Sequence, residues 1–101
     1  MDDSIVISFL DIVKAVEPLR EKYKIDAVYI FGSYARNEAT AESDVDFLVC
    51  GGNEFRLVNI FAFAEELRKI LGKPIDAFEI NEINEDSDFY RTIMKERRLV
   101  A

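Results

Sequence analysis

The sequence predicts an α/β (α+β) fold, in which helices pack on a small mixed β-sheet. Short runs rich in β-branched and aromatic residues alternate with longer segments whose apolar residues recur at helical spacing. That alternation is typical of helices laid on a sheet. Half of the 101 residues are hydrophobic, which is enough for one modest core. We therefore expect a single domain over residues 1–101, without room for a second, substrate-recognising domain.

The first expected element is a helix over residues 3–23. Its apolar residues at helical spacing are Ile5, Phe9, Ile12, Val13 and Val16. Asp3 or Ser4 is the expected N-cap, because a side-chain oxygen can accept from the free N–H groups of the first turn. Pro18 lacks an N–H group and clashes inside a helix. It should therefore kink this segment or open a second short helix as its first residue.

Three strands are expected, at residues 25–31 (IDAVYIF), 45–50 (VDFLVC) and 74–80 (PIDAFEI). Gly32 ends the first strand, and residues 33–36 are expected to form a helical turn. Residues 37–43 (NEATAES) read as a polar loop that leads to the second strand. Gly51 and Gly52 end that strand.

A long helix is expected over residues 53–71, capped by Asn53, and Gly72 and Pro74 mark its end. Its expected buried stripe is formed by Leu57, Ile60, Phe61, Ala64, Leu67 and Leu71. Further apolar residues lie outside that stripe, at Phe55, Val58, Ala62 and Phe63. In so small a domain, a helix this apolar around its girth favours a second face for a partner over deep burial. A last helix is expected over residues 88–97.

Acidic residues outnumber basic ones, 20 to 13, which gives a formal charge of −7. Such a chain repels nucleic acid unless its basic residues cluster, so direct nucleic-acid binding is not expected. One small basic cluster occurs near the C-terminus, formed by Arg91, Lys95, Arg97 and Arg98. A solvated helix face is favoured for it over contact with phosphate or a partner. The acidic balance suits a basic protein partner or a bound divalent metal.

The chain has one cysteine, Cys50, and no histidine. An internal disulfide, a Cys/His zinc site and a Ser-His-Asp triad are therefore excluded. Any bound metal must be held by oxygen ligands, which favours Mg²⁺ or Mn²⁺. No apolar run approaches the ~20 residues of a membrane span, and the start Met1-Asp2-Asp3 is wrong for a signal peptide. We expect a cytoplasmic protein without membrane contact, and Cys50 in its core.

Asp44 and Asp46 stand at the start of the second expected strand. Alternate residues of a strand point to the same face, with Cα atoms about 6.5–7 Å apart. Two carboxylates so placed can share one divalent ion or bridge two. Burying them unpaired among apolar neighbours would be costly, and a metal removes that cost. Alone, an Asp-x-Asp pattern is more often a loop cap followed by a solvent-facing residue on a sheet edge.

Gly32 and Ser33 follow the first strand directly. A glycine there lets the backbone approach a ligand closely. The N–H groups that open the following turn, together with the Ser33 hydroxyl, can hold phosphate oxygens. When such a pair stands alone, an ordinary strand-to-helix turn is the commoner explanation. The combination is more informative, because ten residues separate Gly32-Ser33 from Asp44-Val45-Asp46 on the adjacent strand.

The pattern Gly-Ser-x10-Asp-x-Asp, followed by apolar strand residues, resembles the signature of the DNA polymerase β-type nucleotidyltransferase superfamily. Within it, the run FGSYAR…A…SDVDFLV resembles the minimal nucleotidyltransferase (MNT) family. The resemblance covers essentially the whole chain, with its core at residues 30–49, and it implies the nucleotidyltransferase fold. Many members of that family are antitoxins paired with a small helical HEPN-domain toxin.

The resemblance also implies roles for individual residues. Asp44 and Asp46 would bind metal and act in catalysis. A third carboxylate is implied on the strand after the long helix, where Asp76 lies, with Glu79 as a nearby competitor. The third acid would bind the second metal and serve as general base. Gly32-Ser33 would position the nucleotide phosphates.

Two interpretations stay open for Arg36, which lies just after the Gly-Ser pair. It contacts nucleotide phosphate, or it only pairs with Glu38 or Glu42 at the surface. Asn37 departs from the family, which often has glycine at this position. Because Asn also tolerates a left-handed backbone, we expect the turn to survive.

The function implied by the resemblance is Mg²⁺-dependent transfer of AMP from ATP to a hydroxyl, with a tyrosine of a cognate HEPN toxin as the acceptor. Two Mg²⁺ ions are implied, with Mn²⁺ as an alternative. The chain would act as an antitoxin in a hetero-oligomer with that toxin. The competing class is a binding module with a vestigial site, which neutralises its partner by stoichiometric contact. Transfer to a small molecule such as an antibiotic usually needs an added helical domain, which does not fit in this length.

Overall fold

The computed structural model describes residues 6–101. In chain order these residues form α1 (Phe9–Lys22), β1 (Ala27–Phe31), the 3-10 turn η1 (Gly32–Tyr34), β2 (Val45–Cys50), α2 (Asn59–Leu71), β3 (Ile75–Glu79), the 3-10 turn η2 (Ile80–Glu82), α3 (Asp88–Glu96) and β4 (Arg98–Leu99). The bounds of β2 are those predicted, and β1 and β3 are shorter than predicted. The helical turn after β1 is confirmed.

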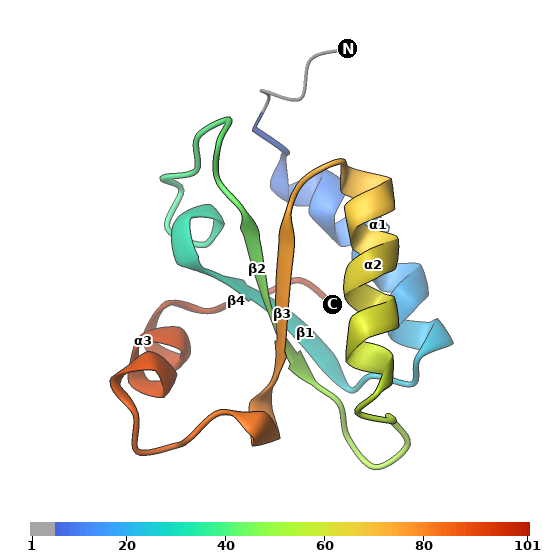
Figure 1. Ribbon diagram of the computed structural model, residues 1–101. Helices are drawn as coiled ribbons and strands as arrows, with labels where there is room; N and C mark the ends of the chain where they lie inside the picture. Colours follow the sequence, from blue (N-terminus) through green and yellow to red (C-terminus); the bar gives the residue numbers. More distant parts are fainter. Residues whose placement is uncertain (1–5) are drawn as a thin grey trace.

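The strands form one mixed sheet in the order β3-β2-β1-β4. β1 runs antiparallel to β2 and β4, whereas β2 runs parallel to β3. Figure 1 shows α1 and α2 together on one face of this sheet and α3 on the other. The predicted fold class is confirmed. The short strand β4 was not predicted, because its two exposed residues carry no alternation that a sequence pattern could reveal.

Both faces of the sheet carry a hydrophobic cluster, and β2 contributes to each. Val45, Phe47 and Val49 belong to the larger cluster, which includes the buried residues of α1 and α2. Leu48 belongs to the smaller cluster, with Phe31 and Ile93 of α3. Because side chains alternate along a strand, Asp46 shares the face of Leu48. The sheet therefore presents Asp46 on the side that α3 covers.

Helix α1 begins at Phe9 and is capped by Ser8, whose Oγ accepts from the Asp11 N–H at 3.1 Å. The caps predicted at Asp3 and Ser4 lie outside the described residues, as does Ile5. Pro18 lies inside one continuous helix, so a second short helix does not begin there.

Helix α2 begins at Asn59, later than predicted, and Asn53 is not its cap. Phe55 explains the delay, because its ring packs against the larger core cluster. The ring also lies so close to Gly51 that a Cβ on that glycine would be 2.4 Å from it. The chain must complete this contact before it turns into the helix. The predicted end is confirmed, since Gly72 has the left-handed φ of +66° that closes a helix.

The buried face of α2 differs from the predicted stripe. It consists of Ile60, Phe63, Ala64 and Leu67. Phe63 is fully buried and meets the ring of Phe47 edge to face at 6.1 Å. Leu57 and Phe61 were predicted to be buried and are 46% and 75% exposed. Leu57 lies before the helix, and Phe61 projects away from the face that Phe63 and Phe47 define, so apolar surface remains at this end of α2.

Candidate active site

The turn η1 depends on Gly32 for two reasons. The residue has a φ of +74°, a conformation that side-chain-bearing residues rarely adopt. A Cβ at this position would also lie 2.4 Å from the Oδ2 atom of Asp46. The Gly32 carbonyl accepts from the N–H groups of Ala35 and Arg36 at 3.0 and 3.1 Å, which closes the turn. The glycine therefore brings the backbone of the turn directly against the Asp46 carboxylate.

The three strands place Gly32, Asp46 and Asp76 in a row across the sheet. Asp46 lies opposite Phe31 in the β1–β2 register, next to Gly32, and opposite Asp76 in the β2–β3 register. Adjacent strands are about 4.8 Å apart, and paired residues point to the same face. Asp44 lies just before β2, and both it and Asp76 are exposed, whereas Asp46 is half-buried. The three acids singled out in the sequence thus converge on one face.

The pKa of Asp46 is raised to about 6, mainly because its carboxyl is partly buried and then because the charges of Asp76 and Asp44 are nearby. Within residues 6–101, no three His, Cys, Asp or Glu side chains form a ready-made metal cluster. The donor set still fits a hard divalent cation, because it consists only of carboxylate oxygens whose mutual repulsion such an ion would relieve.

Glu79, the competitor for the third acid, does not share this face. It is buried, and its carboxylate accepts from the N–H groups of Gly51 at 3.0 Å and Asn81 at 2.7 Å. Those bonds join the end of β2 to the turn η2. The structure therefore gives Glu79 a packing and capping role and brings Asp76 to the site.

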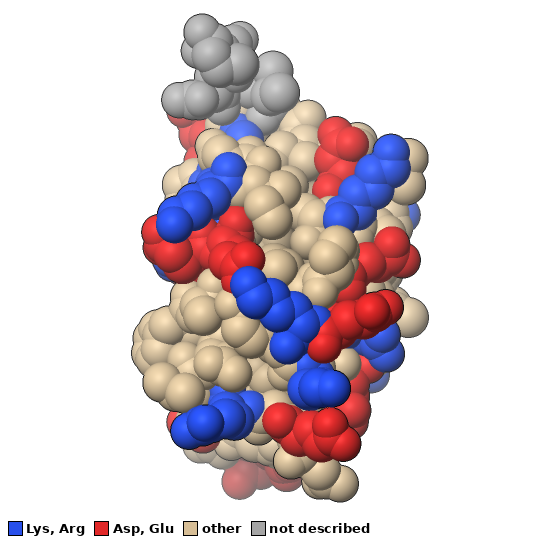
Figure 2. All heavy atoms as spheres, turned by 90° about the vertical axis from the view of Figure 1, so that its right-hand side faces the viewer, with Lys and Arg blue, Asp and Glu red and all other residues tan. Residues whose placement is uncertain are grey.

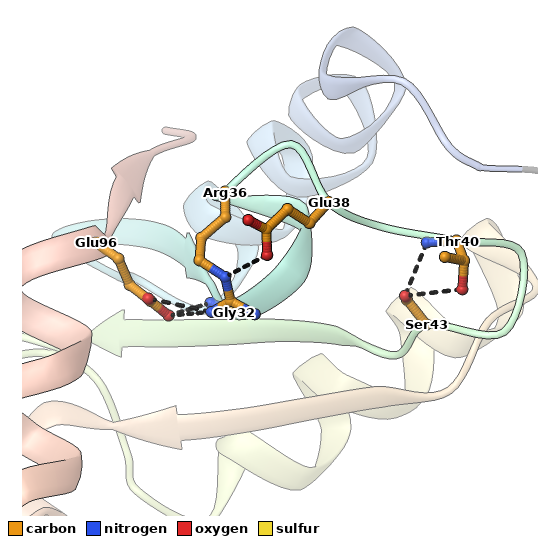
Figure 3. Close-up of polar contacts among 6 residues, drawn as sticks. All are labelled: Gly32, Arg36, Glu38, Thr40, Ser43 and Glu96. Carbon is orange, nitrogen blue, oxygen red and sulfur yellow. Dashed lines mark hydrogen bonds and ion pairs between the residues drawn. The ribbon is translucent and has the colours of Figure 1, made fainter.

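Arg36 is held by two glutamates (Figure 3). Its Nε atom donates to Oε1 of Glu38 at 3.0 Å, and its Nη1 atom donates to both carboxylate oxygens of Glu96 at 3.1 Å. Glu42, the other partner considered from the sequence, forms no ion pair with it among the described residues. Glu96 was missed by sequence reasoning, because it is far from Arg36 in the chain and no local motif marks it.

The loop between η1 and β2 is fastened by its own polar groups. Asn37 has a φ of +60°, as expected for a residue that replaces glycine in a left-handed turn. The Ser43 Oγ accepts from the Thr40 N–H at 2.9 Å (Figure 3). From outside the loop, the buried Lys73 donates to the Ala41 carbonyl at 2.6 Å. These bonds fix the chain immediately before Asp44.

The basic cluster near the C-terminus is largely used within the chain. Arg97 stacks over the ring of Tyr29 at 4.6 Å, and Arg98 over that of Phe9 at 3.7 Å. Arg91 forms an ion pair with Asp88. Cys50, expected in the core, is half-buried, and burial raises the pKa of its thiol.

A glycine turn set against carboxylates on neighbouring strands is the arrangement expected of a nucleotidyltransferase, and comparison with known proteins agrees. The family described as "Polymerase beta, Nucleotidyltransferase" matches residues 14–101, and the chain belongs to it. It is an enzyme of the nucleotidyltransferase class. None of the described helices is long and apolar enough to cross a membrane.

The related proteins indicate which kind of nucleotidyltransferase this chain resembles. A Methanocaldococcus jannaschii protein, provisionally named a protein adenylyltransferase, is 36% identical over 74 residues, which are 73% of this chain and 80% of the relative. The protein adenylyltransferase MntA of Thermococcus cleftensis is 32% identical over 78 residues, 77% of either chain. The fold also matches a chain of a solved structure described as a tri-AMPylated Shewanella oneidensis HEPN toxin in complex with MNT antitoxin. That match has a TM-score of 0.68 and 18% identity, and it covers 91% of this chain and 70% of the other.

Proposed function

We propose that this chain is a protein adenylyltransferase that transfers AMP from ATP to a hydroxyl of a HEPN toxin and thereby acts as its antitoxin. The observation that carries the proposal is the row of Gly32, Asp46 and Asp76 across three strands, which sets a phosphate-holding turn beside oxygen ligands. The names of the adenylyltransferase relatives and of the AMPylated HEPN toxin complex support the choice of AMP and of a toxin as acceptor.

The turn would bind the β- and γ-phosphates of ATP. Gly32 has no side chain to keep a phosphate away. The Ser33 hydroxyl and the backbone N–H groups of η1 beyond Gly32, whose own N–H donates to Glu96, are suitable donors. Arg36 adds a positive charge beside the turn. Its Nη2 atom, which has no hydrogen bond among residues 6–101, would donate to a phosphate oxygen.

Asp44, Asp46 and Asp76 would hold the divalent ions, with Mg²⁺ preferred and Mn²⁺ as the alternative. Bound ions of this kind neutralise phosphate charge and lower the pKa of an acceptor hydroxyl. The carboxylates themselves would orient the triphosphate, because they fix the positions of the cations that balance its negative charge. Asp46 lies beside the turn, and Asp76 lies next to it on β3.

In the transfer step the acceptor oxygen attacks the α-phosphorus of ATP in line with the leaving group. The bond from that phosphorus to the bridging oxygen breaks, and pyrophosphate leaves with the electron pair. Asp76 takes the proton of the acceptor hydroxyl. Positioning of the reacting groups and neutralisation of charge supply most of the catalysis in this chemistry.

We assign the acceptor hydroxyl to a tyrosine of the toxin. We assign the docking surface for the toxin to the exposed apolar residues at the start of α2, which are Leu57, Val58 and Phe61. Figure 2 looks onto the α1/α2 side and shows charges of both signs scattered over it, with uncharged surface between them. The excess negative charge of the chain favours a basic partner. The functional unit would be a hetero-oligomer.

The test mixes the purified chain with the protein encoded beside it, Mg²⁺ and ATP labelled on the α-phosphate. Label should appear on the partner, at tyrosine when the modified peptide is sequenced. If a correctly folded chain transfers no label, the proposal is wrong. The alternative, a binding module with a vestigial site, predicts instead that ATP with Mg²⁺ does not raise the melting temperature of the chain.

A further inference from the structure

The end of α3 reaches the phosphate-holding turn through one side chain, that of Glu96. It is the last residue of the helix, and 17% of its side chain is exposed. Its Oε1 atom accepts from the Gly32 N–H at 2.7 Å, while Nη1 of Arg36 donates to both of its oxygens at 3.1 Å (Figure 3). One carboxylate thus ties the backbone of the turn to the Arg36 guanidinium that follows it.

These bonds fix groups that would otherwise be free to rotate. With its positive φ, Gly32 is the most adaptable point of the turn, and Glu96 holds its N–H while its carbonyl closes the turn. The Arg36 guanidinium is held at Nε by Glu38 and at Nη1 by Glu96, and within residues 6–101 its Nη2 atom has no hydrogen bond. The Nη2 edge of the guanidinium is therefore held in a fixed orientation and can still donate a hydrogen bond.

The backbone around Glu96 is anchored on both sides. On one side, Ile93 of α3 is buried against the sheet, and the ring of Phe89 packs on Phe31 and Phe78 at 5.8 and 5.4 Å. On the other side, Arg98 pairs with Ile30 in the β4–β1 register. Both anchors hold the backbone from which the Glu96 side chain reaches the turn. The contact is thus supported on both sides of Glu96 in the chain.

We propose that Glu96 is a positioning residue for the nucleotide. It holds the Gly32 peptide and the Arg36 guanidinium in the geometry that receives the triphosphate, and it couples α3 to that geometry. The inference rests on the proposed function, because the ligand is taken to be ATP. It differs from a blocking role, in which the Glu96 carboxylate competes with phosphate for the same donors.

The test compares Glu96→Gln and Glu96→Ala with the control Glu85→Gln, which removes the same charge from an exposed loop residue. Binding of a non-hydrolysable ATP analogue with Mg²⁺ is measured by calorimetry, and KM and kcat by transfer of labelled AMP. Loss of charge-assisted bonds should raise Kd and KM about 5- to 50-fold, more for Ala than for Gln, with kcat changed less than KM. The control should match the parent.

Two further measurements show whether Glu96 acts through its partners. In an Arg36→Ala background, Glu96→Gln should have a much smaller effect on Kd, because the shared contact is already lost. The amide proton of Gly32, followed by NMR without nucleotide, should shift upfield in Glu96→Ala and remain near its parent position in Glu96→Gln. This second readout does not depend on ATP.

The outcomes separate the two proposals. A parent chain that neither binds ATP nor transfers AMP overturns the proposed function. A parent chain that binds ATP, with Glu96→Gln binding it equally well or more tightly, overturns only the role of Glu96, and tighter binding would indicate the blocking role. If Glu96→Ala fails to fold, the Glu96→Gln variant and its combination with Arg36→Ala still test the role of Glu96.

Discussion

The two faces of the sheet differ in the interactions that hold them together. The face under α1 and α2 is a dense apolar core in which Phe47, Phe63 and Ile12 are fully buried. The opposite face carries a small cluster around Ile93 and leaves the acids partly open to solvent. Packing holds the first face, whereas contacts between distant polar groups arrange the second. Stability and chemistry should therefore respond to different substitutions.

The largest effect should come from the open face and should spare the fold. Asp46→Asn removes a carboxylate from the centre of the row, so AMP transfer should fall by more than about 100-fold. Asp44→Asn should behave in the same way. Transfer of labelled AMP measures activity, and circular dichroism checks the fold. If either variant keeps full transfer, its carboxylate is not a metal ligand.

The second prediction concerns the stability of the face of the sheet that α1 and α2 cover. Phe63→Ala should lower the free energy of unfolding by about 3–5 kcal/mol, because it leaves a cavity beneath Phe47. Phe61→Ala is the matched control two positions away and should change it by less than about 0.5 kcal/mol, since that ring is exposed. Urea denaturation measures both. Equal losses would mean that the described phase of α2 is wrong.

The pH dependence of stability tests the contrast between the two faces of the sheet, because the ionised Asp46 carboxylate should destabilise the folded state. Its pKa is raised from 3.8 to about 6, so between those values the folded state binds more protons than the unfolded state. The contribution of Asp46 to stability should therefore fall as pH rises through this window, and the full penalty from this group should apply above it. After allowance for solvent screening the penalty is about 1–2 kcal/mol.

Thermal melts of the metal-free chain at pH 5 and pH 7.5 measure this penalty. Asp46→Asn should be the more stable protein at pH 7.5, and the difference from the parent should shrink at pH 5. Added Mg²⁺ should stabilise the parent more than the variant. A parent chain whose melting temperature rises from pH 5 to pH 7.5 relative to Asp46→Asn would contradict the raised pKa.

The smallest effect is expected in the loop between η1 and β2. Asn37→Gly should change the free energy of unfolding by less than about 0.5 kcal/mol, because glycine relieves the left-handed backbone but has more freedom to lose on folding. Urea denaturation again provides the measurement. A larger change would show that the Asn37 side chain contributes more than its backbone conformation.

Local sequence patterns predicted those parts of the molecule that local forces determine. Strand β2 follows from a run of apolar residues that Asp46 alone interrupts, and the end of α2 follows from Gly72, whose left-handed φ closes the helix. The convergence of Asp46 with Asp76 came from resemblance to a family, and the strand register agrees with it.

The missed features depend on contacts between distant segments. Phe55 contacts Gly51 and the core ahead of α2, and Phe61 points away from the helix face that Ile60, Phe63 and Leu67 bury. Strand β4 exists only because β1 offers it an edge. Glu96 meets Gly32 only because α3 crosses the open face of the sheet. No pattern within one segment contains that information.

The contact between Gly32 and Glu96 joins positions 64 residues apart, which has a consequence for how the protein matures. Asp44, Asp46 and Asp76 all precede α3 in the chain, and none of the contacts between β1, β2 and β3 involves Glu96. Contacts of such long sequence separation tend to form late in folding. We therefore expect Glu96 to reach the Gly32 turn late in folding, after β1, β2 and β3 have paired.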